Sequence, residues 1–261
     1  MMRMNLLILA FALSLCGCAV KDHAGTPVTI TVASYNIRSF RGMDGVRDID
    51  RTIAAIDRLH CDICGLQEVR KTDGDAVAPI DLAAGRLGMQ AFFAQTLARP
   101  GFIYGIGLLS RVPFEIVEVV KLRVPEGLEP RSAIFARVTL PDGFFYLVNT
   151  HLGANNDAGR KMQMEHILET IREKGYTPVL LIGDMNSHFG SETMKLLHKD
   201  WMIFGDATLT APAGKPRWRF DYIAGYPKDA FRGTGYRVID DPVSSDHRPV
   251  VMELELLHPA R

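Results

Sequence analysis

Hydrophobic and polar residues alternate along this chain with two periods, one typical of strands and one typical of helices. Residues 28–37, VTITVASYNI, change from strict alternation to a continuous apolar run, as a strand entering a core does. Residues 46–60 are different, because they carry apolar residues at helical spacing: Val46, Ile49, Ile53, Ile56 and Leu59. The pattern therefore predicts a strand followed by an amphipathic helix.

The same two patterns predict further elements down the chain. Strands are expected at 62–68, 103–110, 114–122, 132–140, 144–152 and 178–183, and near 217–225, 235–240 and 248–256. Helices are expected at 192–197 and at 157–173, the latter with these residues facing inward: Met162, Ile167, Leu168 and Ile171. A turn at Asp142-Gly143 makes 132–140 and 144–152 a hairpin. Because hairpins and helical connections are mixed, we expect one α/β domain over 28–258, with two packed mixed sheets and helices outside.

Residues 1–17 differ from the rest. The basic start MMRMN precedes the apolar run LLILAFALSL, which is too short to cross a bilayer comfortably and is typical of an export signal. Leu15-Cys16-Gly17-Cys18 resembles a bacterial lipobox, although Cys16 departs from the usual pattern. We therefore expect cleavage before a lipidated Cys18, a tether at 18–27, and a protein anchored at the bacterial cell envelope. Ordinary secretion, with cleavage elsewhere, is the alternative.

Composition adds little to this picture, except that it excludes a strongly basic protein that attracts nucleic acid over its whole surface. The chain has 261 residues, of which 47% are hydrophobic and 23% charged, as in ordinary globular proteins. Its 30 basic and 30 acidic residues cancel, so no chain-wide attraction for nucleic acid exists, although a local basic patch would escape this count. Beyond the leader, Cys61 and Cys64 lack a second pair for zinc and enter a strand. We expect small buried side chains rather than a redox motif, and export leaves a disulfide between them open.

Polar side chains stand where the predicted strands end. The set comprises Asn36, Gln67, Glu68, Asn149, His151, Asp184, Asn186, Asp221, Asp246 and His247. A single Asp or His at such a position is more often a cap or a hydrogen-bonded structural residue. Six strand ends of the same kind indicate a shared ligand, because burying these polar groups costs stability unless a ligand compensates them.

The motifs that hold these residues are YNIR, LQEV, GIGLLSR, NTHL, GDMN, FDYI and SDHRPVV. In this order, over about Val28 to Leu256, they resemble the endonuclease/exonuclease/phosphatase superfamily. The combination of GD-x-N with a terminal SDHRPV is the specific part of the match. The resemblance implies a DNase I-like four-layer α/β sandwich and a metal-dependent phosphoesterase, in which water attacks phosphorus in line with the leaving oxygen.

The resemblance also implies a magnesium site. Glu68 is the expected principal ligand, Asn36 would add an amide oxygen, and Asp246 a second carboxylate, directly or through water. An oxygen-rich site of this kind suits Mg²⁺ or Mn²⁺ better than zinc. Taken alone, Glu68 would be an ordinary residue at a strand end.

Four further residues receive catalytic roles from the resemblance. Asp184 would orient or deprotonate the attacking water, and Asn186 would hold that water or a phosphate oxygen. His247 would contact the phosphate, with Asp221 bonded to its other ring nitrogen to fix its orientation. Either Asp184 or His247 can serve as the base, and Asp221 taken alone would be a structural cap.

His151 is implied as a second phosphate-stabilising imidazole, and Arg131 as a phosphate clamp, unless it is only a charge at the rim. We expect a monomer acting on DNA or RNA, a phospholipid headgroup or a small phosphate ester. Residues 70–79 are expected to form a loop without the aromatic and basic alternation that stacks bases. The alternatives are a non-catalytic module that binds a phosphorylated ligand or a partner protein, and a membrane-tethered structural lipoprotein, which would not need this set of residues.

Overall fold

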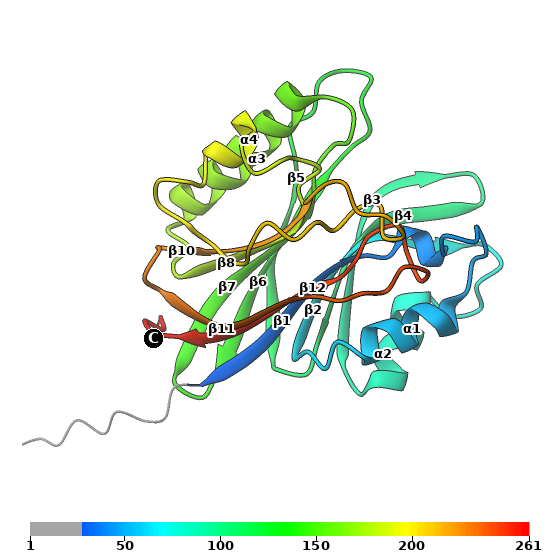
Figure 1. Ribbon diagram of the computed structural model, residues 1–261, viewed down its shortest axis with the longest axis horizontal. Helices are drawn as coiled ribbons and strands as arrows, with labels where there is room; N and C mark the ends of the chain where they lie inside the picture. Colours follow the sequence, from blue (N-terminus) through cyan, green and yellow to red (C-terminus); the bar gives the residue numbers. More distant parts are fainter. Residues whose placement is uncertain (1–27, 261) are drawn as a thin grey trace, which may run out of the picture.

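The computed structural model describes residues 28–260. Two six-stranded sheets pack against each other, and helices cover the outer face of each sheet (Figure 1). This arrangement is the four-layer α/β sandwich expected from the sequence. Its strand ends, rather than its helices, determine where the polar residues meet.

The first sheet has the strand order β11-β12-β1-β2-β4-β3. Its strands are β1 (Thr29–Asn36), β2 (Ile63–Thr72), β3 (Gln90–Arg99), β4 (Phe102–Ser110), β11 (Phe231–Val238) and β12 (Val250–Leu256). Strand β1 runs parallel to β2 and antiparallel to β12. The carboxyl ends of β1 and β2 therefore lie at the same edge as the segment that leads into β12.

The second sheet has the strand order β5-β6-β7-β8-β10-β9. Its strands are β5 (Phe114–Lys121), β6 (Ser132–Leu140), β7 (Gly143–His151), β8 (Val179–Asp184), β9 (Met202–Ile203) and β10 (Asp221–Tyr226). Strand β7 is parallel to β8, and β10 is antiparallel to it, so that Asp184 pairs with both His151 and Asp221. Strands β6 and β7 form the predicted hairpin, in which Leu140 pairs with Gly143.

Helices α1 (Ile49–Asp57) and α2 (Pro79–Leu87) cover the first sheet, and α3 (Asp157–Lys174) and α4 (Glu192–Lys195) cover the second (Figure 1). Helix α1 begins where the Asp48 side chain accepts a hydrogen bond from the Arg51 amide, and α3 begins at Asn156 in the same way. A short 3₁₀ turn, Arg38–Phe40, follows β1.

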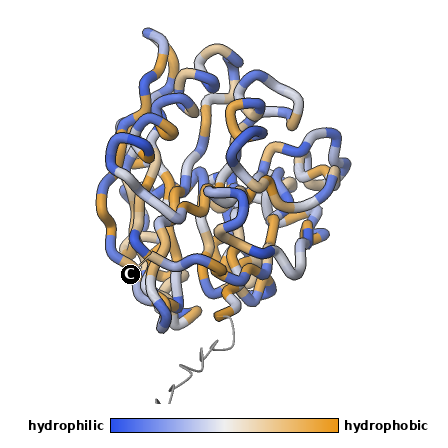
Figure 2. Tube along the Cα trace, turned by 90° about the vertical axis from the view of Figure 1, so that its left-hand side faces the viewer, coloured by the Kyte–Doolittle hydropathy of each residue, from blue (hydrophilic) through white to orange (hydrophobic). Residues whose placement is uncertain are grey.

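The main core lies between the two sheets and contains Val32, Ile182 and Leu254, none of them exposed to solvent. Burying one such side chain contributes about 1.5–3 kcal/mol. Two further apolar clusters lie beneath the two helix pairs. Hydrophobic residues gather along the strands inside the domain, and the outer loops are more hydrophilic (Figure 2). The strands are thus held rigidly up to the residues at which they end.

Two predicted inward positions are wrong. Val46 is 56% exposed, because α1 begins only after the Asp48 cap. Met162 is 39% exposed, and Gln163 and Met164 take the inward positions on α3 instead. The Gln163 side chain accepts a hydrogen bond from a backbone amide, so a polar residue occupies a position that hydrophobic spacing assigned to its neighbour.

The predicted loop at 70–79 is also wrong in its first part. Residues 70–72 continue β2, with Arg70 paired to Tyr104 of β4 beyond a register shift between Leu66 and Val69. Charged residues here do not alternate with apolar ones, so the period of a strand is absent. Helix α2 and strand β3 were not predicted either, and most β3 residues are partly exposed.

Cys61 and Cys64 are buried and free, as small core residues. The predicted signal peptide, lipidation at Cys18 and tether at 18–27 lie outside the described residues. Among residues 28–260, no helix combines the length and the apolar character needed to cross a membrane.

Candidate active site

The residues predicted from the strand ends lie at one end of the sandwich and come from both sheets. Asn36 ends β1, and Glu68 lies within β2 of the first sheet. Asp184 ends β8 and Asp221 begins β10 of the second sheet. Each sheet therefore supplies part of a common site, which neither sheet could form alone.

A hydrogen-bonded amide joins the two halves. Asn36 Nδ2 donates to Asp184 Oδ2 at 2.9 Å and to Glu68 Oε1 at 3.2 Å. The backbone carbonyl of Asn36 accepts a bond from Ser245 Oγ at 2.7 Å, which holds the segment before β12 against β1. The structure thus brings together three carboxylate-bearing segments that are far apart in the sequence.

His247 lies between two carboxylates. Its Nδ1 is 2.9 Å from Asp221 Oδ2, and its Nε2 is 3.6 Å from Asp184 Oδ2. Burial by itself would lower the pKa of His247, but the charges of Asp221 and Asp184 outweigh it and raise that pKa to about 10. The imidazole is therefore held in one orientation and is protonated at neutral pH.

Two carboxyl groups of the site, Asp184 and Glu68, have pKa values above those of ordinary surface acids. Burial raises the pKa of Asp184, and the nearby charge of Asp221 adds to this, whereas His247 and the Asn36 hydrogen bond oppose it. Burial also raises the pKa of Glu68, with a further contribution from Asp246. Such shifts show that the ionised forms are poorly compensated by the protein itself.

His151 and Asn186 lie on the second-sheet side of Asp184. The Asn186 side-chain Nδ2 is 3.1 Å from His151 Nε2 and donates to the Leu152 carbonyl, while its backbone amide donates to Asp184 Oδ1 at 2.9 Å. Burial lowers the pKa of His151 well below the usual value, with Arg131 and His247 adding to the effect. His151 is therefore a neutral imidazole, and its Nε2 also lies 3.5 Å from Asp184 Oδ2.

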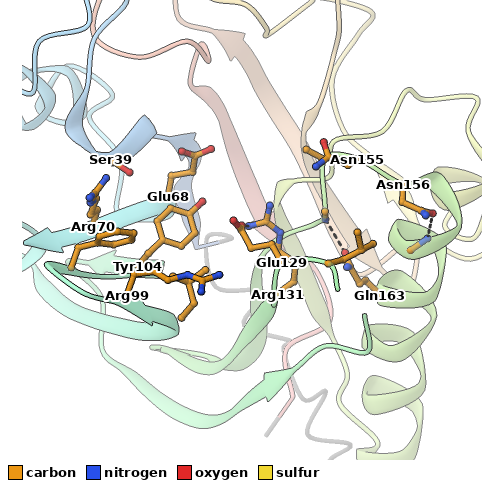
Figure 3. Close-up of a pocket in the computed structure, with 16 residues that line it drawn as sticks. Ser39, Glu68, Arg70, Arg99, Tyr104, Glu129, Arg131, Asn155, Asn156 and Gln163 are labelled. Atoms are coloured by element: carbon orange, nitrogen blue, oxygen red, sulfur yellow. Dashed lines mark hydrogen bonds and ion pairs between the residues drawn. The ribbon is translucent and has the colours of Figure 1, made fainter. Parts of the chain in front are cut away.

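Two predicted site residues, Arg131 and Asp246, make no hydrogen bond within the network that joins Asn36, Glu68 and Asp184. Arg131 is 7% exposed and pairs with Glu129 at 2.5 Å, and it lines the same cavity as Glu68 and Tyr104 (Figure 3). Asp246 Oδ2 is 3.2 Å from Arg38 Nε, and both side chains are partly exposed. Asp246 makes no hydrogen bond to Asn36 or Glu68 within residues 28–260, although its charge acts on Glu68.

The backbone at the site adopts unusual conformations. Glu68 has φ 57° and Asn186 has φ 46°, in the left-handed region that residues with a Cβ rarely occupy. Gly183 lies so close to β7 that a Cβ there would come within 2.1 Å of the Thr150 carbonyl oxygen. These positions aim the side chains and are held in place by the surrounding fold.

Asp184, Asp221 and His247 form a buried group with the spacing of a metal site, in which a cation would have to displace the proton of His247. One ligand atom from each lies within 4.8 Å of the others, the only such grouping among the described residues. The sequence had assigned these three residues to catalysis and the metal to Glu68, Asn36 and Asp246. The two sets adjoin, because Asn36 bonds to Glu68 and Asp184 at once.

Sequence reasoning assigned no chemical role to two polar residues beneath the site, and for Asn149 it expected at most the positioning of a loop. Gln67 Nε2 donates to Asn149 Oδ1 at 2.8 Å, and Asn149 Nδ2 donates to the Leu66 and Gly107 carbonyls. Both side chains are buried between the sheets. They fix the distance between β2 and β7, and only their unusual polarity within apolar strands marked them in advance.

A sequence model described as the Endonuclease/Exonuclease/phosphatase family matches residues 33–247. The chain belongs to the endonuclease/exonuclease/phosphatase family. Members of this family are hydrolases, and the family is metal-dependent. No curated protein matches the sequence at a significant level.

Solved structures similar to this chain share the family fold at low sequence identity. One is an endonuclease/exonuclease/phosphatase from Beutenbergia cavernae, with TM-score 0.70, 22% identity and coverage of 87% of this chain and 72% of that one. A mannosyl-6-phosphatase from Bacteroides thetaiotaomicron has TM-score 0.68, 20% identity and coverage of 86% and 99%. The human Nocturnin catalytic domain with bound sulfate has TM-score 0.66, 19% identity and coverage of 88% and 96%.

Proposed function

We propose that this protein is a metal-dependent phosphoesterase, which hydrolyses a phosphodiester or phosphomonoester by in-line attack of water. The observation that carries the proposal is the network in which Asn36 joins Glu68 to Asp184 across the two sheets. It places a carboxylate suited to a cation beside a carboxylate and an imidazole suited to proton transfer. Family membership supports the same reaction class.

The residues present fit a hard divalent cation, Mg²⁺ or Mn²⁺. Glu68 and Asp246 offer carboxylate oxygens, which are the donors that such cations prefer. The Asn36 amide oxygen instead accepts a hydrogen bond from the Arg38 backbone amide, and its Nδ2 holds the Glu68 carboxylate in place. The raised pKa of Glu68 supports this assignment, because a buried and uncompensated carboxylate gains most from a neighbouring cation. A cation bound there would supply positive charge against the phosphate oxygens.

Asp184 is the proposed base. Its two oxygens are fixed by the Asn186 amide and by Asn36, and its raised pKa moves it towards the range in which a carboxylate takes up a proton from water. His247 is protonated at neutral pH and so suits the opposite task, donating to a phosphate oxygen or to the leaving oxygen. Asp221 keeps its ring in position.

His151, Asn186 and Arg131 are proposed to bind the phosphate. Arg131 is a buried cation whose Nε has no hydrogen-bond partner among the described residues, so a phosphate oxygen would satisfy it. Neutral His151 can stabilise the phosphate through an N–H without adding a second buried positive charge beside His247. Preorganised donors of this kind stabilise charge that develops in the transition state.

The substrate class is open between nucleic acid, a phospholipid headgroup and a small phosphate ester. The mannosyl-6-phosphatase among the similar structures supports the small ester, and the balanced charge of this chain argues against unspecific duplex binding. From the sequence alone we also propose a monomer that is exported and lipidated at Cys18. Membrane fractionation of a Cys18→Ala variant tests the anchor, since the variant should leave the membrane fraction.

Hydrolysis of bis-p-nitrophenyl phosphate, p-nitrophenyl phosphate, sphingomyelin and plasmid DNA, each with Mg²⁺ or EDTA, tests the function. We expect turnover that EDTA abolishes, and Asp184→Ala and His247→Ala to lower kcat by roughly 10²–10⁴-fold. The exposed Asp57→Ala and His60→Ala are matched controls that should keep full activity. Absent or metal-independent turnover on every substrate would favour the non-catalytic phosphate-binding module.

A further inference from the structure

A cavity of about 420 Å³ opens beside Glu68. The β3–β4 side contributes Leu97, Arg99, Phe102 and Tyr104, and the opposite wall comes from the segment before β6 and the start of α3 (Figure 3). Its volume lies in the range of sites for small organic ligands. Because Glu68 lines this cavity, a ligand whose phosphate reaches the site would place its organic part in it.

Arg70 lines this cavity and has no role in the proposed reaction. Its guanidinium carbon lies 3.7 Å from the centroid of the Phe102 ring. Its Nε is buried without a hydrogen-bond partner, and within residues 28–260 the side chain makes no ion pair. A stacked and partly desolvated cation with free N–H groups is a strong site for an anion.

Two other charged residues of the cavity already have partners in the protein. Arg131 pairs with Glu129, and Glu68 accepts a bond from Asn36. Arg99 is exposed at the rim and adds a second positive charge on the side of Arg70. Arg70 follows Glu68 by two residues on β2, beyond the register shift at which Glu68 adopts φ 57°. Figure 3 shows Arg70 and Arg131 on opposite sides of Glu68, so an anion on Arg70 would be distinct from the phosphate that Arg131 is proposed to bind.

We propose that Arg70 is a specificity residue, and that the substrate is a compact phosphoester whose organic part carries a second anionic group, a phosphate or a carboxylate. The proposal rests on the proposed function, and it names the substrate class of the same site. Arg70 binds the second anion, Phe102 fixes the guanidinium plane, and Arg99 strengthens the field. The amide of Asn155 on the opposite wall suits hydroxyl groups of a sugar-like part.

Calorimetric titration of the full chain in the Asp184→Asn background with Mg²⁺ tests the proposal without turnover. Glucose 6-phosphate is the probe with one anion, and glucose 1,6-bisphosphate and 6-phosphogluconate carry a second one. We expect at least one of the latter two to bind about 10–100-fold more tightly, as a charge-assisted hydrogen bond predicts. Comparing these two probes identifies whether the second anion is a phosphate or a carboxylate.

Arg70→Gln should abolish this preference while leaving the affinity for glucose 6-phosphate unchanged. Arg137→Gln is the matched control, because Arg137 also lies on a phenyl ring, 3.9 Å from the Phe144 centroid, but does not line the cavity. Phe102→Leu should reduce the preference only in part. Thermal melting of each variant separates a local effect from a loss of folding.

Equal affinity of the wild-type cavity for all three probes, or a preference that survives Arg70→Gln, would overturn the proposal. Tight binding of a single-stranded oligonucleotide, with no gain from the second anion on a sugar, would overturn the small-molecule class. If the preference holds but the wild-type protein hydrolyses no phosphoester, the proposed function fails and the anion site stands. The two failures are therefore distinguishable.

Discussion

Replacing Asp184 by Asn should stabilise the metal-free protein while abolishing hydrolysis. Asp184 is 1% exposed, and its pKa rises from 3.8 to about 7, first because it is buried. A folded-state pKa above the unfolded value means that ionisation opposes folding. The penalty is absent below about pH 4, grows through the window between the two values, and is complete above about pH 7.

The magnitude follows from the width of that window. About three pKa units correspond to about 4 kcal/mol at pH 8, and to about 2 kcal/mol at pH 5, where the window is only partly crossed. The substitution also removes the partner 3.6 Å from His247 Nε2 and one acceptor for Asn36, at a cost of about 2 kcal/mol. The net gain is therefore near zero at pH 5 and about 2 kcal/mol at pH 8.

Urea unfolding in EDTA at the two pH values measures this difference, with Asp57→Asn as an exposed control. For a domain of this size, about 2 kcal/mol also raises Tm by roughly 4–8 °C. A variant that is less stable than the wild type at pH 8, or a gain that does not increase from pH 5 to pH 8, would refute the reasoning. Either result would mean that the protein itself already compensates the Asp184 charge.

Three further predictions concern the same site. Asp221→Asn should lower kcat by roughly 10²-fold and move the alkaline loss of activity to lower pH, because Asp221 raises the pKa of His247; a pH–rate profile of both proteins checks this. Gly183→Ala should lower the free energy of unfolding in urea by at least about 2 kcal/mol, because the added Cβ would clash with the Thr150 carbonyl oxygen. Gly190→Ala is the control, since Gly190 has open space around it, and it should change that free energy by less than about 0.5 kcal/mol. Asn149→Leu should destabilise by about 1–3 kcal/mol, because it leaves buried partners unsatisfied, and an unchanged Tm would contradict the assigned network.

The fold was predictable wherever a strand was fully buried or strictly alternating. The bounds predicted for strand β8 and helix α3 agree with the structure within a few residues, because a continuous apolar run marks the strand and helical spacing marks the helix. Strand β3 was not predicted, because its residues QAFFAQTLAR are mostly half-buried or exposed and do not alternate between apolar and polar. Residues 70–72 were assigned to a loop, because all three are polar. The prediction that Met162 faces inward was wrong because a hydrogen bond from the Gly153 amide holds the polar Gln163 side chain inside instead.

The site was predictable as a set of strand-end residues but not as a geometry. Sequence order cannot show that Asn36 bonds to Asp184, because their proximity depends on how one sheet packs on the other. Arg70 was assigned to a loop without stacking partners, and its aromatic partner, Phe102, lies on a neighbouring strand. Cross-strand pairs of this kind leave no signal within a single stretch of sequence.

The contribution of both sheets to one site has a mechanical consequence. The proposed cation ligand Glu68 lies on the first sheet and Asp184 on the second, so the cation and the base keep their spacing only while the two sheets keep their packing. Apolar contacts and the Asn36–Asp184 and Gln67–Asn149 hydrogen bonds maintain that packing. A substitution that loosens the packing between the sheets, even far from the site, should therefore lower activity at temperatures at which the protein is still folded.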